Sequence, residues 1–80
     1  MQNFLKIMFK KLELEILSVV GKKAASYEFS YHDIANAKIK GMLQINRSYL
    51  EDFLKNELIT EQEFSYYMNE IKDLEGRYTI

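Results

Sequence analysis

Few side chains in this sequence could do chemistry, and their spacing does not suit catalysis. His32 is the only residue of the type that exchanges a proton near neutral pH, and no nucleophile or second acid is signalled beside it. There is no cysteine, so neither a disulfide nor a thiolate metal site can form. No calcium-binding loop or glycine-rich phosphate loop is present. We therefore expect a protein that is not an enzyme and has no cofactor, no metal and no small-molecule substrate.

The acidic side chains occupy positions that helix formation alone explains. Glu61 and Glu63 fall in the first turn of an expected helix, where the helix dipole favours negative charge. Asp73 and Arg77 are spaced i, i+4 in the favourable order for an ion pair on a helix surface. These carboxylates are therefore assigned to solvated helix faces and not to acid–base catalysis.

Length and composition indicate one small packed domain, residues 1–80. The apolar fraction is 48% and the aromatic fraction is 14%, both too high for a disordered chain. There is no proline and there are only three glycines, which favours long helices. No secretory signal is recognisable, and no apolar run reaches the roughly 18 residues of a membrane span. We expect a cytoplasmic protein without a membrane span.

Charge is unevenly distributed along the chain. The net charge is −1, with a balance of +3 over residues 1–23 and −4 over residues 24–80. Because nucleic-acid binding requires phosphate neutralisation, an acidic C-terminal part argues against broad binding to DNA or RNA.

Residues 45–74 have the pattern of a helical hairpin. Thr60 followed by Glu63 forms a capping box, and Ile59 and Phe64 flank it where a hydrophobic staple would form. Two stripes of apolar residues, spaced three and four positions apart, lie on either side of this box. The stripes are Leu50, Phe53, Leu54 and Leu58, and then Phe64, Tyr67, Met68, Ile71 and Leu74. We expect Phe64 and Ile71 to be buried against the first stripe.

The whole chain predicts an all-α fold, a small bundle of about four helices ending in this hairpin. The expected helices cover about residues 3–23, 31–44, 47–57 and 61–75. A capping box of Ser30 and Asp33 begins the second helix, and Asn46 or Ser48 begins the third. Gly76 is expected to stop the last helix and to leave residues 76–80 frayed.

An α+β fold is the alternative. Apolar and polar residues alternate in residues 11–16 and again in residues 27–31, and Gly21 could lie in a turn between them. This pattern would give a β-hairpin at residues 10–31. The helix is preferred because an i, i+4 apolar stripe persists from Leu5 to Val20.

The first helix would be apolar over much of its circumference, which suits a helix covered by a second chain. We therefore predict a homodimer. Tyrosines outside the expected core are typical anchors of protein interfaces, since they combine contact area with a hydroxyl. The predicted protein interface consists of Phe4, Met8, Leu12, Ile16, Tyr27, Phe29, Tyr31, Tyr49 and Tyr66.

A second hypothesis comes from residues 41–59, which resemble the recognition half of a helix-turn-helix motif. The polar run from Asn46 to Ser48 would open a helix facing DNA. The resemblance implies a DNA-binding transcriptional regulator that uses residues 33–59. Its nucleic-acid contacts would be Lys38, Lys40, Arg47 and Ser48.

Protein binding is preferred over DNA binding because the chain is acidic after residue 24. The expected function is that of a small, non-enzymatic protein–protein interaction module. The abundance of lysine, isoleucine and asparagine suggests a low-GC bacterium or its phage or plasmid. The expected role is therefore that of a phage- or plasmid-encoded regulator or inhibitor of a larger protein.

Overall fold

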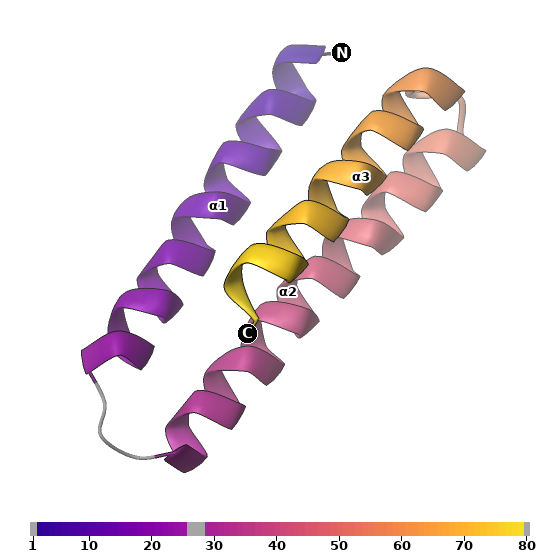
Figure 1. Ribbon diagram of the computed structural model, residues 1–80. Coiled ribbons are helices and arrows are strands. Elements are labelled where there is room, and N and C mark those ends of the chain that lie inside the picture. Colours follow the sequence, from indigo (N-terminus) through magenta and orange to yellow (C-terminus); the bar gives the residue numbers. More distant parts are fainter. Residues whose placement is uncertain (1, 26–28, 80) are drawn as a thin grey trace.

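The computed structural model describes residues 2–25 and 29–79 (Figure 1). They form three helices, α1 (Gln2–Ala25), α2 (Phe29–Lys55) and α3 (Glu61–Tyr78). α2 runs antiparallel to both of the others, so α1 and α3 point in the same direction. The molecule is elongated, 45 × 18 × 16 Å, because α2 has 27 residues and rises about 1.5 Å per residue.

The core is built around α2, which packs against both other helices, whereas α1 and α3 make few contacts with each other. Apolar residues three, four and seven positions apart lie on the inner side of each helix. The fully buried side chains are Leu5 and Ile16 of α1, Ile39, Leu43 and Leu50 of α2, and Ile71 of α3. A single apolar core therefore connects all three helices.

In the connection between α2 and α3, backbone amides donate hydrogen bonds to carbonyls in the last turn of α2. The amide of Leu58 donates to the carbonyl of Phe53 at 2.8 Å, and the amide of Glu57 donates to Leu54 at 3.1 Å. This is a Schellman motif, in which Glu57 adopts the left-handed conformation with φ of 58°. Because the motif reverses the chain direction within a few residues, α3 folds back along α2.

The predicted capping box is present at the start of α3. The amide of Glu63 donates to the Thr60 hydroxyl at 3.1 Å, and the amide of Thr60 donates to the Glu63 carboxylate at 2.9 Å. Ile59 is buried and Phe64 packs against the core at its edge, as expected for the residues that flank the box. Leu58, which the spacing places in the first of the two apolar stripes, is instead half-exposed.

The prediction of an all-α fold is confirmed, but the prediction of four helices is wrong. The expected helices at 31–44 and 47–57 are one continuous helix, α2. Asn46 does not cap a new helix, because its side-chain amide donates to the Met42 carbonyl one turn earlier at 2.8 Å. Ser30 does not precede the helix either, since α2 already begins at Phe29. Packing of the inner face against two neighbours outweighs these local stop and start signals.

The α+β alternative and the expected end of the last helix are also wrong. The alternative β-hairpin is not formed, because residues 10–25 and 29–31 are helical. Gly76 does not stop α3, which continues to Tyr78. The hydroxyl and the amide of Thr79 both donate to the Glu75 carbonyl and satisfy it at the helix end. The described part of residues 76–80 is therefore ordered helix and cap.

Replacing Gly41 with alanine (Gly41→Ala) is expected to raise the free energy of unfolding by about 1 kcal/mol. Gly41 lies inside α2 without a positive φ, and an added Cβ would meet no atom within 4 Å. Alanine also restricts the unfolded chain more than glycine does. Equilibrium urea unfolding measures the change. The matched control is Ala37→Gly, an exposed position one turn earlier, which should lower stability by a similar amount. Destabilisation by Gly41→Ala would contradict a helical position 41.

Candidate protein-binding surfaces

Three aromatic rings form a row on the surface where α1 and α2 meet. The ring of Phe4 meets Phe53 edge-to-face, with centroids 5.1 Å apart, and the ring of Tyr49 stacks on Phe53 at 6.3 Å. Phe53 is half-buried, whereas Phe4 and Tyr49 are 46% and 49% exposed. We call Phe4, Phe53 and Tyr49 the aromatic row. It combines residues that are far apart in the sequence into one exposed apolar surface.

A shallow groove of about 300 Å³ continues this surface along α1 and α2. Met8 and Met42 lie in it, both half-buried, together with Ile45, which is exposed. Lys11 and Glu15 border it from α1. Methionine side chains adapt to differently shaped partners, so the groove extends the apolar area beside the row.

Three of the residues predicted for the protein interface, Phe4, Met8 and Tyr49, thus lie on one face. Leu12 and Ile16 belong to the core, since they are 2% and 0% exposed within a single chain, although Leu12 also lines the groove beside Met8. Of the four α1 residues predicted for the contact, Phe4 is exposed and Met8 is half-buried, so a partner would meet mainly these two, and the contact itself stays a prediction.

The structure describes one of the three aromatic side chains that were predicted for the interface at residues 27–31. Tyr31 is half-buried. Tyr27 lies outside the described residues, and only the backbone of Phe29 is described.

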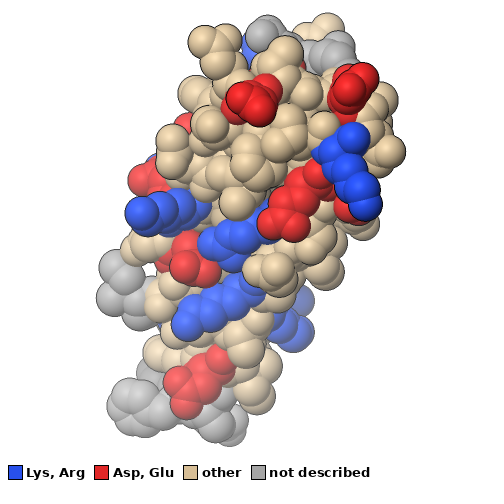
Figure 2. All heavy atoms as spheres, turned by 90° about the vertical axis from the view of Figure 1, so that its right-hand side faces the viewer, with Lys and Arg blue, Asp and Glu red and all other residues tan. Residues whose placement is uncertain are grey.

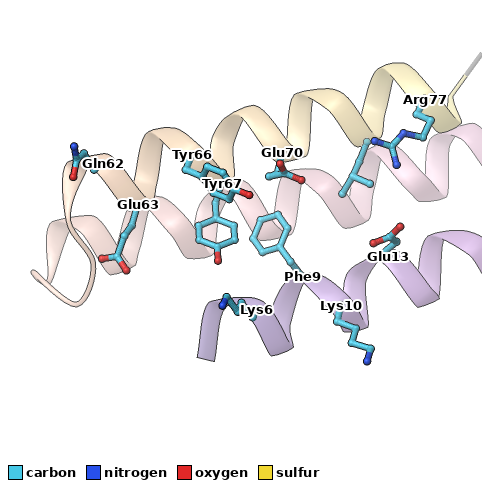
Figure 3. Close-up of a pocket in the computed structure, with 11 residues that line it drawn as sticks. Lys6, Phe9, Lys10, Glu13, Gln62, Glu63, Tyr66, Tyr67, Glu70 and Arg77 are labelled. Carbon is cyan, nitrogen blue, oxygen red and sulfur yellow. The ribbon is translucent and has the colours of Figure 1, made fainter. Parts of the chain in front are cut away.

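Tyr66 belongs to a second hollow, which lies between the parallel helices α1 and α3 (Figure 3). We call it the α1/α3 groove. Its volume is about 580 Å³, and it exists because α1 and α3 make few direct contacts. Phe9 and Tyr67 meet in it with ring centroids 4.7 Å apart, and Tyr66 packs edge-to-face on Tyr67 at 5.0 Å.

Burial is the largest cause that raises the pKa of Tyr67 above its ordinary value. Tyr66 and the carboxylates of Glu63 and Glu70 add to the effect. Both carboxylates also line the groove, which identifies this side of it as acidic.

Several exposed apolar side chains were not among the predicted interface residues. Ile7, Leu14 and Leu17 project from α1 with 69%, 59% and 43% exposure. Ile34 and Ile45 are exposed on α2. Phe9 and Phe53 were missed as surface residues because their spacing is equally consistent with core positions.

The helix-turn-helix geometry is absent from the described residues 33–55, which form one uninterrupted helix. Lys38 and Lys40 are both exposed. Because they are two positions apart in a helix, they point to opposite sides of α2. Arg47 faces α3, where it forms an ion pair with Glu75 at 3.5 Å. Ser48 is exposed in mid-helix. The predicted nucleic-acid residues are therefore not brought together.

The charged side chains on the side of the molecule away from α1 are interspersed. Figure 2 shows basic side chains next to acidic ones on this face. Within residues 2–25 and 29–79 no group of three or more His, Asp or Glu side chains is placed to hold a metal ion. None of the described helices is apolar enough over a sufficient length to cross a membrane.

A scan against protein-family models finds no match, and searches of the curated proteins and of the solved structures find none either.

Proposed function

We propose that this protein is a small, non-enzymatic module that binds another protein through the aromatic row. The observation that carries the proposal is the convergence of Phe4 and Tyr49 on Phe53 at the surface, each about half-exposed. Aromatic side chains that are already packed on one another lose little conformational freedom on binding. They therefore make effective anchors for a partner.

The surroundings of the row suit a protein partner. Ile45, Met8 and Met42 extend it as apolar surface, and Lys11 and Glu15 give it a polar edge. An apolar centre with a charged rim is the usual anatomy of a protein interface. A module that contributes a surface and no chemistry acts by occupying a site on a larger protein, which is how a small regulator or inhibitor works.

The test is capture followed by titration with purified components. Tagged wild-type chain is used to capture a protein from a lysate of cells that encode it, and the captured protein is then purified. Isothermal titration calorimetry compares its affinity for the wild type and for the variant Phe4→Ala/Tyr49→Ala. Loss of two anchors should weaken binding at least about 30-fold, the effect of one hot-spot residue or more.

Ile34→Ala is the matched control, because Ile34 is equally exposed on α2 but is not part of the row. It should leave the affinity unchanged within about twofold, and circular dichroism should give the same helix content for all variants. A captured protein that binds the Phe4→Ala/Tyr49→Ala variant as tightly as the wild type would contradict the proposal.

The alternative function, DNA binding, is tested by titrating duplex DNA with the wild type and with the variant Lys38→Ala/Lys40→Ala. Both lysines are exposed, so their removal should not disturb the core. Sequence-specific DNA binding by the wild type that this variant abolishes, and that falls steeply with salt, would favour a DNA-binding regulator instead.

A further inference from the structure

The α1/α3 groove has two rims along which positive and negative side chains follow each other in opposite order. Figure 3 shows the α1 rim below and the α3 rim above, with Glu13 and Arg77 pointing toward each other at one end. The α1 rim is basic and then acidic, and the α3 rim is acidic and then basic. The residues in chain order are Lys6, Lys10 and Glu13 on α1, and Glu63, Glu70 and Arg77 on α3.

Because α1 and α3 are parallel, this pattern is also complementary to a second copy of itself. A two-fold axis that runs along the groove places α1 of each chain on α3 of the other, with both helices in the same direction. Lys6 and Lys10 then face the acidic part of the partner's α3, and Glu13 faces the basic end of that helix. The symmetry makes each of these contacts twice.

We propose that this protein forms a symmetric dimer through the α1/α3 groove, with α1 of each chain packed on α3 of the other. Phe9 and Tyr67 pack on each other at the centre of the groove. Tyr66 packs on Tyr67 and is 59% exposed, so its ring gains cover from the partner. The dimer goes beyond the proposed function and uses a different surface. It leaves both aromatic rows uncovered, and so displays two copies of the partner-binding surface.

The net charges of the helices favour pairing of α1 with α3 over pairing of α1 with α1. α1 carries five lysines and two glutamates, and α3 carries five acidic and two basic residues. Pairing of α1 with α1 through its exposed Ile7 and Leu14 would bring two sets of lysines together, which like-charge repulsion disfavours. Pairing of α1 with α3 brings two helices of opposite net charge together.

The proposed dimer should be weak and sensitive to salt. Tyr67 is already buried within one chain, so few apolar side chains remain to be covered at the centre. Charge pairs on exposed rims mainly provide orientation and are screened by salt. Sedimentation equilibrium should therefore find a mass of 9.5 kDa at low concentration and twice that value at high micromolar concentration. Added salt should shift the equilibrium toward the monomer.

Two charge reversals test the arrangement, Lys10→Glu on the α1 rim and Glu70→Lys on the α3 rim. Glu63 is left in place because its side chain caps α3. Each single variant puts like charges together twice per dimer, so self-association should weaken at least about tenfold. An equimolar mixture of the two variants should form a dimer again, because both contacts are then between opposite charges.

The double variant Lys10→Glu/Glu70→Lys should also dimerise like the wild type. It keeps the net charge of −1, so its recovery cannot come from a change in overall charge. Recovery in the mixture distinguishes pairing of α1 with α3 from an antiparallel pairing of α1 with α1. In the second arrangement Glu70 does not face position 10, so the two reversals could not compensate each other. Thermal unfolding of each variant confirms that the helices remain intact.

A wild-type chain that stays at 9.5 kDa up to millimolar concentration would overturn the dimer. Single variants that associate as strongly as the wild type would overturn it as well, and so would a mixture that remains monomeric. None of these results bears on the proposed function of the aromatic row, which is tested by binding of a captured protein to the variant Phe4→Ala/Tyr49→Ala. Failure of the dimer and failure of the proposed function are therefore distinguishable.

Discussion

Replacing Gln44 with proline (Gln44→Pro) is expected to lower the free energy of unfolding by about 3 kcal/mol or more. Gln44 is an exposed residue in the middle of α2, which is helical from Phe29 to Lys55. Proline removes the hydrogen bond that residue 44 donates to the preceding turn, and its ring clashes with the carbonyl there. Because α2 packs against both other helices, a kink at this point would disturb the entire core.

The control is Gln44→Ala, which keeps the backbone amide and favours the helix, so its stability should stay within about 0.5 kcal/mol of the wild type. Urea unfolding followed by circular dichroism measures both variants. The comparison is informative because two shorter helices with a connection near residues 44–47 would accept a proline there. A small effect of Gln44→Pro would thus argue against the continuous helix.

Truncating Leu43 to alanine (Leu43→Ala) is expected to cost about 3 kcal/mol of unfolding free energy. Leu43 is completely buried in the cluster that joins the three helices. The loss combines the removed apolar contacts with the cavity that remains. For a chain of 80 residues this is a large part of the total stability, which is about 4–12 kcal/mol at typical values per residue.

Ile34→Ala serves again as the control, since it removes an aliphatic side chain from the same helix at an exposed position. Its effect should lie within about 0.5 kcal/mol. Equal effects of Leu43→Ala and Ile34→Ala would mean that α2 does not present its Leu43 side to the core. Thermal unfolding of both variants at one protein concentration avoids a contribution from self-association.

The hairpin was predictable from sequence because every signal for it is local. Thr60 and Glu63 are three residues apart, and each supplies the side chain that satisfies the other's backbone amide. Ile71 and Leu74 follow at helical spacing and are buried as expected. Local hydrogen bonds and periodicity depend on neighbouring residues alone, so they can be recognised before the tertiary structure is known.

The number of helices was not predictable in this way. Asn46 and Ser48 are residue types that often precede a helix, but the same types are tolerated inside a helix whose opposite face is buried. Leu43 and Leu50, which lie seven positions apart on either side of Asn46, are both in the core. Their burial is a tertiary effect, and it decides that α2 continues through residues 44–48.

The candidate binding surfaces were likewise predictable from the sequence only in part. The aromatic surplus indicated a binding protein, and Phe4, Tyr49 and Tyr66 are indeed exposed. Sequence periodicity identified an apolar stripe from Leu5 to Val20, but it could not tell whether this stripe packs within the chain or against a second chain. Packing against α2 selected the side with Leu12 and Ile16.

The amino-acid sequence by itself favoured the all-α class over an α+β alternative, and it determined the hairpin turn and the absence of cysteine chemistry, because these depend on residue types and on short-range spacing. The tertiary structure decided which apolar residues remain at the surface and which charges line a common groove. Phe4 and Phe53, or Lys10 and Glu70, are far apart in the chain. Only the packing of three helices on one another brings such residues to the same surface.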